Sequence, residues 1–318
     1  MSTNTYTPEG TRLNTPENRE YITSITGLER AMASGKILEG MAILCDPELN
    51  LHVDLYGAKG IIEKNEAVYC RQGEILKDIA IITRVGKPVC FKVMSVEKTK
   101  SGVVAHLSRR MAQMECERNF LADLIPGDII PAKVTHLEQF GAFVDIGCGI
   151  SSLLSVDCIS VSRISHPSDR LKNGMMIDVI VKNIDESNRR IFVSRRELLG
   201  TWEENVEFFN VGQTVAGIVR SIESYGVFIE LTPNLAGLAE LRDDRPGMDV
   251  QIGSTATVFI KSIIPERMKV KLVLIDLSKD EPPLPPQKIF VDPGEVKHMA
   301  RWRYSPLCCD KVIETVFE

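Results

Sequence analysis

The sequence predicts an all-β protein made of three tandem barrels, the first of them divergent. Two observations lead to this prediction. A strand pattern that combines aromatic residues, a glycine and alternating aliphatic residues occurs at 140–147 and again at 225–231, with a weaker copy at 51–55. The copies recur at intervals of roughly 90 residues, which suits a small barrel followed by a connector. A chain of 318 residues accommodates three such domains.

The strand pattern itself predicts a ligand-binding face. Val144 and Ile146 alternate with Phe143 and Asp145, as in a strand with one buried face. If the aliphatic side chains face the core, the ring and the acid point outward. Burying a Phe ring would contribute about 1.5–3 kcal/mol to stability, so an outward ring requires another explanation. Phe228 occupies the same place in the third copy.

Residues 1–35 are expected to form a polar tail followed by one helix. The first residues are polar and interrupted by proline and glycine, which is typical of disorder. Residues 16–34 place apolar side chains at helical spacing, and Gly35 is expected to end the helix. We interpret the helix as a lid on the first repeat, with a docking helix as the alternative.

The first repeat spans 36–108 and is the divergent one. Short strands are expected at 37–45, 51–55, 80–84, 88–96 and 103–107. Leu49 and His52 stand where the later repeats have aromatic residues. We interpret His52 as a surface or interface residue, with a stacking contact to RNA as the alternative.

The second repeat follows a helical connector at 109–126 and spans 127–198. Its expected strands are 129–137, 142–147, 153–154, 176–184 and 191–195, with a polar loop at 158–174. Five short strands and one long loop in about seventy residues are typical of a small closed barrel such as the OB-fold.

The third repeat spans 211–278, after a connector at 199–210. The aromatic residues Trp202, Phe208 and Phe209 are expected to pack this connector region against a barrel. The long loop is shortened here, to 241–250. A proline-rich linker and a tail follow at 279–318. The alternating basic and aromatic residues of 301–304 predict either a tail docked on a barrel, which we favour, or a contact to nucleic acid.

Composition restricts the function classes. The net charge of −5 gives no overall basic field, so any binding of nucleic acid must be local. The eight cysteines include no Cys-x-x-Cys pair and are expected to be reduced thiols of a cytoplasmic protein. We expect no metal and no cofactor. The N-terminus lacks an apolar leader, and no stretch approaches membrane-spanning length, so no contact with a membrane is expected.

The second repeat resembles the S-one RNA-binding domain, an OB-fold unit that is repeated in the largest protein of the bacterial small ribosomal subunit. The resemblance rests on Gly127, Val134, the segment 140–147, Ser165-His166-Pro167, 171–174, Asp185, and Arg189-Arg190-Ile191 before Ser194. The third repeat matches well in its first half, and the first repeat only in outline.

The resemblance implies a set of RNA-binding residues. The stacking aromatic residues of the family fall on Phe140 and Phe143, the acidic residue on Asp185 and the basic one on Arg189. In the third repeat the aromatic residues are Tyr225 and Phe228, the basic position is Lys269, and Pro265 takes the acidic position. The family's usual histidine is replaced by Ser155 and Glu240, which weakens one expected base contact.

Physical chemistry supports this set, because every base has a π-face that can stack on a ring at about 1–3 kcal/mol per base. Basic residues near the rings would neutralise phosphates and make binding sensitive to salt. The basic residues expected in this role are Lys133, Arg163, Arg170, Lys182 and Arg189 of the second repeat. The remaining residues expected to bind RNA are His166 in the second repeat and Lys261 in the third.

We therefore expect a non-enzymatic protein of the translation machinery that holds single-stranded RNA, including mRNA. The resemblance implies that the first repeat attaches the chain to the small ribosomal subunit. An enzyme such as a ribonuclease is a second class, but no separate domain remains to hold a catalytic cluster. A protein-docking scaffold or RNA-degradation accessory is a third, which the acidic charge balance favours.

Overall fold

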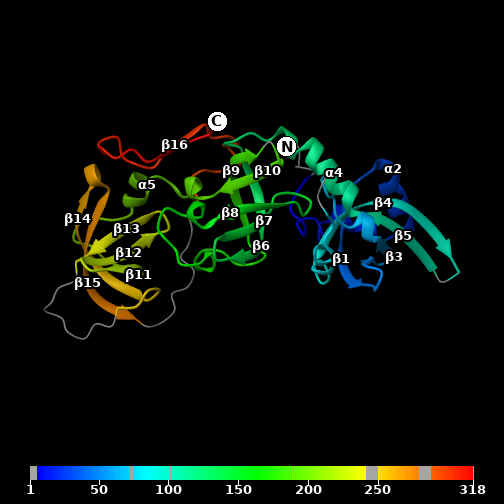
Figure 1. Cartoon of the computed structure of the whole chain (residues 1–318), viewed down its shortest axis with the longest axis horizontal. Helices are drawn as coiled ribbons and strands as arrows, with labels where there is room; N and C mark the ends of the chain where they lie inside the picture. Colours follow the sequence, from blue (N-terminus) through cyan, green and yellow to red (C-terminus); the bar gives the residue numbers. More distant parts are fainter. Residues whose placement is uncertain are drawn as a thin grey trace. The chain divides into compact units, whose positions relative to one another are not determined.

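The computed structural model describes residues 6–71, 75–100, 102–185, 187–240, 250–278 and 288–317. Within them the chain forms three closed five-stranded barrels, which confirms the predicted all-β fold (Figure 1). The expected linker prolines and residues 241–249 of the shortened loop lie outside these ranges. No helix in the described part of the chain is long and apolar enough to cross a membrane.

Residue contacts divide the chain into two compact units. Unit 1 contains Met1–Leu124, Pro131–Lys133 and Asp145–Ser151. Unit 2 contains Ile125–Ile130, Val134–Val144 and Ser152–Glu318. The first barrel therefore lies in unit 1, and the third barrel with most of the second lies in unit 2. The domain boundaries given above stay predictions.

Barrel 1 has the strand order β1-β2-β3-β5-β4. Its strands are β1 (Leu38–Cys45), β2 (Leu51–Leu55), β3 (Ala58–Ile62), β4 (Pro88–Thr99) and β5 (Gly102–Ser108). The expected strand at 80–84 is wrong, because its first part belongs to a short helix, α3 (Asp78–Ile82). The strand that was missed is β3, which follows β2 after only Tyr56 and Gly57.

The N-terminal segment forms two helices where one was expected. The helices are α1 (Pro16–Ile22) and α2 (Ile25–Ser34), and the hydroxyl of Ser24 caps the second by accepting a hydrogen bond from the Gly27 N–H. Gly35 ends α2 in the left-handed conformation (φ 62°), as expected. Ile22 and Leu28 are buried in the core of barrel 1, which confirms the interpretation of a lid.

Barrels 2 and 3 share one plan. Barrel 2 contains β6 (Ile129–Glu138), β7 (Gly141–Asp145), β8 (Ser151–Ser155), β9 (Met176–Asp185) and β10 (Arg190–Ser194). Barrel 3 contains β11 (Thr214–Glu223), β12 (Gly226–Thr232), β13 (Leu235–Ala239), β14 (Thr255–Ile264) and β15 (Lys269–Ser278). In each barrel the third strand pairs with the fifth in parallel. Inward aliphatic residues such as Val144 and Ile229 are fully buried, as the alternation predicts.

The connectors are helical, as expected. The first is α4 (Arg109–Asn119), and the second contains α5 (Trp202–Val206), which begins with a capping box formed by Thr201 and Glu204. Trp202 is buried in the core of barrel 3, which confirms its packing role. Phe208 differs, because its ring is partly exposed and lies 6.0 Å from that of Phe290 in the tail.

The C-terminal tail docks within unit 2, as favoured above. It forms a small sheet of β16 (Arg301–Arg303) and β17 (Glu314–Val316). Trp302 and Tyr304 are buried, and the Tyr304 hydroxyl donates a hydrogen bond of 2.6 Å to the Asn234 carbonyl. These rings are therefore not free to stack on bases.

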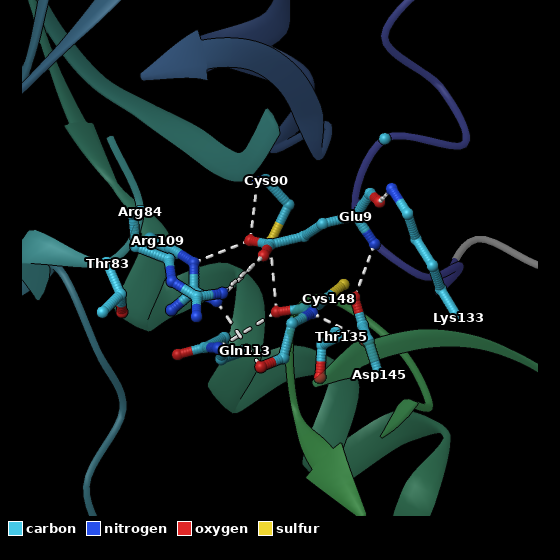
Figure 2. Close-up of polar contacts among 12 residues, drawn as sticks. Glu9, Thr83, Arg84, Cys90, Arg109, Gln113, Lys133, Thr135, Asp145 and Cys148 are labelled. Carbon is cyan, nitrogen blue, oxygen red and sulfur yellow. Dashed lines mark hydrogen bonds and ion pairs between the residues drawn. The ribbon is translucent and has the colours of Figure 1, made fainter. Parts of the chain in front are cut away.

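A buried network in unit 1 holds the N-terminal segment (Figure 2). The Glu9 carboxylate accepts hydrogen bonds from Arg109 Nε (2.7 Å) and from the backbone N–H of Cys90 (3.0 Å). The Glu9 N–H donates to Asp145 Oδ2 at 2.7 Å, and Asp145 Oδ1 accepts from the N–H groups of Gly147 and Gly149. A side chain at Gly149 would collide with Arg109, since its Cβ would lie 2.0 Å from the guanidinium.

The carboxyl groups of this network differ in their pKa values. Burial raises the pKa of Asp145 to about 7, and the nearby Glu9 carboxylate adds to the effect. Burial also raises the pKa of Glu39 to about 7, although the N–H groups of Gly10 and Arg12 donate to its carboxylate. Burial is the largest influence on Glu9 and would raise its pKa, but the charge and hydrogen bonds of Arg109, the Cys90 N–H and the Arg84 charge together outweigh it, so that pKa is lowered.

These shifts predict that unit 1 loses stability as the pH rises. Between about pH 4.5 and 7 the folded chain keeps a proton on Glu39 that the unfolded chain has released, so its free energy of unfolding falls across that window. Glu39→Gln keeps an acceptor oxygen without the charge. We expect it to stabilise unit 1 by about 1–3 kcal/mol at pH 8 and to have little effect at pH 5.

Hydrogen exchange of the β1 and β4 amides is the suitable measurement, because both tryptophans lie in unit 2. Glu48→Gln is the control, since Glu48 is exposed on the same barrel and its substitution should leave the pH profile unchanged. Destabilisation of unit 1 by Glu39→Gln at pH 8 would contradict this account.

Candidate nucleic-acid interface

Barrels 2 and 3 each carry an aromatic pair on the outside of the second strand. Phe140 and Phe143 meet edge to face, with ring centroids 6.0 Å apart and planes at 88°. Tyr225 and Phe228 repeat this geometry at 6.3 Å and 87°. Phe140 is 54% exposed and Tyr225 is 61% exposed, whereas their partners are half-buried. Each pair therefore offers one free ring and one ring held by the sheet.

A third outward residue, which the sequence analysis missed, extends each pair across the barrel. Phe192 of β10 pairs in parallel register with Leu153 of β8, and Lys271 of β15 pairs with Leu238 of β13 in the same way. Phe228 lies opposite Leu238, so Lys271 is two strands from the ring, with Leu238 between them. Barrel 2 thus adds a ring at the position where barrel 3 adds a cation. The sequence did contain a signal for Phe192 as an outward ring, because Phe192 alternates with the aliphatic residues Ile191 and Val193.

The lysines expected near the two platforms occupy equivalent places. The β9–β10 register shifts between Phe192 and Val193, which places Lys182 at a bulge, and the β14–β15 register places Lys261 at the matching bulge. Lys261 is exposed. Lys182 is half-buried, and its Nζ lies 3.0 Å from the sulfur of Cys158.

Asp185 and Arg189 flank the hairpin between β9 and β10. The Asp185 carboxylate accepts hydrogen bonds from the side chains of Ser187 and Asn188, which lower its pKa to about 2. Arg189 is exposed and has the left-handed conformation (φ 47°). Met268 of barrel 3 has the same conformation (φ 48°) but is half-buried. We infer that Asp185 positions Arg189 by fixing the turn.

Strand register corrects the assignment of two residues in barrel 3. Asp185 pairs with Arg190, whereas Ile264 pairs with Lys269. Lys269 is therefore the counterpart of Arg190 and not of Arg189, and Ile264 rather than Pro265 takes the acidic position. Leu154 of β8 and Ala239 of β13 occupy matching register positions in their barrels. Ser155 and Glu240 follow these residues directly, so the two are equivalent, as expected.

Two of the basic residues expected at the interface are engaged elsewhere. Arg170 is fully buried and forms an ion pair with Glu230, so its assignment as a phosphate contact is wrong. Lys133 donates from Nζ to the Glu9 carbonyl oxygen at 2.8 Å, which directs its charge to the N-terminal segment. The assignment of Lys133 to the ligand face is corrected accordingly.

The outward acids are also buried. Asp145 and Glu230 point away from their barrel cores as the alternation predicts, but they are only 3% and 2% exposed. Glu9 covers the first, and Arg170 with Arg220 covers the second. Their expected exposure beside the rings is therefore wrong.

Arg163 and His166 lie in the long loop between β8 and β9. Arg163 is exposed. His166 is half-buried, and its Nδ1 accepts a hydrogen bond from the Ser168 N–H at 3.1 Å, where it caps a short 3-10 helix.

Barrel 1 presents a different surface at the equivalent positions. His52 takes the place of the second ring and lies 3.2 Å from Asp46, and Leu49 is partly buried against the core. The cross-strand neighbours of His52 are Leu44 and Ile61, and Leu44 is 52% exposed. His106 pairs with Ile61 and so takes the register position of Phe192 and Lys271. This face therefore combines two histidines with aliphatic residues and bordering acids, and it lacks the aromatic pair.

Comparison with known proteins agrees with the resemblance seen in the sequence. Residues 123–196 match the model of the S1 RNA binding domain, so the recognition of this domain in the second repeat is confirmed. The small ribosomal subunit protein bS1 homolog of Bacillus subtilis is 30% identical over 201 residues, which cover 62% of this chain and 50% of the relative. The bS1 protein of Rickettsia conorii is 30% identical over 209 residues, covering 62% and 36%.

The chain thus spans half the length or less of these relatives. Among solved structures, a multidomain protein with nucleic acid binding domains from Streptococcus pneumoniae aligns with 76% of this chain and 74% of its own length. Its sequence identity is 15% and the TM-score is 0.24.

The geometry predicts that Phe143 contributes to ligand binding and little to folding. Phe143→Ala should weaken the binding of a single-stranded oligouridylate by about 1–3 kcal/mol, because a half-buried outer ring stacks on a base. Phe192→Ala should weaken binding in the same direction. The affinities can be measured by fluorescence anisotropy, with His52→Ala as the matched control that leaves affinity unchanged. If Phe143→Ala instead destabilises the fold by about 3–5 kcal/mol, the ring belongs to the core.

Proposed function

We propose that this protein binds single-stranded RNA, including mRNA, in the translation machinery of the cytoplasm. The observation that supports the proposal best is the repeated edge-to-face aromatic pair on barrels 2 and 3. Stacking on such rings requires unpaired bases and tolerates any sequence, whereas the bases of duplex RNA are already stacked. The proposal assigns binding residues and no catalytic residues.

Local charge complements the rings. Arg189, Lys261 and Lys269 are exposed on the two barrels that carry the rings, and Lys271 adds a cation that Leu238 separates from Phe228. With a net charge of −5, the chain as a whole repels RNA. Affinity then depends on these few contacts, each of which releases counterions when it neutralises a phosphate.

Barrel 1 is proposed to attach the chain to a protein partner on the small ribosomal subunit. Its outer face lacks the aromatic pair and exposes Ile43 (58%), Leu44 (52%) and Met94 (45%). Covering exposed aliphatic side chains with a protein partner removes them from water, which is favourable. The acidic neighbours Asp46 and Glu63 repel phosphate. The relatives named as ribosomal protein bS1 support this choice of partner. Docking to an RNA-degradation complex is the alternative.

One experiment tests both parts of the proposal. Log affinity of the full chain for oligouridylate should fall linearly with log salt, with a slope near −0.7 for each phosphate neutralised. The doubly substituted variant Phe143→Ala/Phe228→Ala should lose this binding and still co-sediment with small ribosomal subunits. A response that is flat with salt would contradict RNA binding. Loss of co-sedimentation in this variant would contradict a separate attachment through barrel 1.

A further inference from the structure

The β8–β9 loop of barrel 2, residues 156–175, begins and ends on its own barrel. The Val156 N–H donates to the carbonyl oxygen of Phe140 at 3.0 Å, so the loop starts beside the first aromatic ring. At its other end, the Met175 carbonyl accepts a hydrogen bond of 2.9 Å from the Val134 N–H.

The middle of this loop is anchored on barrel 3. The Val161 N–H donates to the side-chain oxygen of Asn234 at 2.9 Å, and the Ser162 N–H donates to the Pro233 carbonyl at 3.0 Å. Asn234 is fully buried and also donates from Nδ2 to the carbonyl oxygens of Arg196 and Gly200, both at 2.8 Å. This first anchor is therefore fixed to the connector as well.

A second anchor follows eight residues later along the loop, at a buried ion network. Arg170 pairs with Glu230, which also accepts a hydrogen bond from Arg220 Nε at 2.7 Å. Arg220 in turn lies 3.2 Å from the Asp169 carboxylate. The charges of Arg170 and Arg220 balance those of Glu230 and Asp169. The network therefore carries no net negative charge that would repel RNA.

This second anchor borders the aromatic platform of barrel 3. Glu230 and Phe228 lie two residues apart on the outer face of β12, which separates their side chains by about 7 Å along the strand. The segment between the two anchors carries exposed Arg163 and half-buried His166. These residues are therefore tied to barrel 3, although the sequence places them in barrel 2.

We propose that barrels 2 and 3 bind one continuous strand of RNA, which the 156–175 loop guides from Phe140 to Phe228. In this arrangement Arg163 neutralises a phosphate of the RNA bound to barrel 3. This inference rests on the RNA-binding function proposed above. The buried anchors fix the spacing of the two platforms, so a strand bound to one reaches the other at high effective concentration.

The test compares the salt dependence of Arg163→Ala in two backgrounds of the full chain, with oligouridylates of about 4 to 30 nucleotides, since one OB-fold covers roughly 4–16. In the Phe140→Ala/Phe143→Ala background, RNA binds through barrel 3. There Arg163→Ala should make the slope of log affinity against log salt less negative by about 0.7. In the Tyr225→Ala/Phe228→Ala background it should leave the slope unchanged.

Arg163→Lys is the matched control, because it keeps the charge and should keep the slope in both backgrounds. Tryptophan fluorescence verifies folding, since Trp202 and Trp302 both lie in unit 2. A change of slope confined to the Tyr225→Ala/Phe228→Ala background would assign Arg163 to barrel 2 and overturn the inference. If neither aromatic double substitution weakens binding, the proposed RNA-binding function itself fails.

Length dependence tests the continuous strand separately. For the unsubstituted chain, affinity should keep rising after the oligonucleotide exceeds the length that one barrel covers. With either aromatic pair removed, affinity should level off at the shorter length. An unsubstituted chain that levels off at the same length as both variants would contradict simultaneous binding to the two platforms.

Discussion

A carboxylate removed from water must be paired or hydrogen-bonded, and this constraint shapes both parts of the structure. The second strand of each later barrel alternates two core aliphatic residues with an outward ring and an outward acid. The acid is buried in both cases, Asp145 by the segment that carries Glu9 and Glu230 by Arg170 and Arg220. The matching Asp54 of barrel 1 is exposed. The acidic position on the outer face thus connects distant segments of the chain, while the aromatic position two residues earlier stays partly exposed.

The aromatic pairs make the proposed binding of an anionic polymer compatible with the acidic charge of the protein. Stacking depends on rings and not on net charge, and the cations required are few and close to the rings. Barrel 2 adds Phe192 to its pair, whereas barrel 3 adds Lys271 at the same register position. In the proposed binding mode, the first platform therefore depends more on stacking and the second more on charge. Barrel 1 has His52 and His106 at the equivalent positions and exposes aliphatic side chains beside them.

Period-two alternation within strands made the fold and the aromatic positions predictable from the sequence. It identified Phe143 and Phe228 as outward residues without any knowledge of the tertiary structure. It failed where a contact between distant segments decides the outcome, because no local pattern shows that Arg170 meets Glu230, 60 residues away. The missed strand β3 is interrupted by Gly60 and follows a two-residue turn, so its apolar signal is short. The helical residues of α3 have the composition of a strand.

The central claim is that RNA lies on the aromatic pairs of barrels 2 and 3 and avoids the equivalent face of barrel 1. Photo-crosslinking of the full chain to an oligonucleotide that contains 4-thiouridine, with mass-spectrometric identification of the linked peptides, tests this claim most directly. The account predicts crosslinks in the peptides that contain residues 140–143 and 225–228, and none in the peptide that contains 49–55. Crosslinks concentrated at 49–55, with the two aromatic segments unmodified, would contradict it.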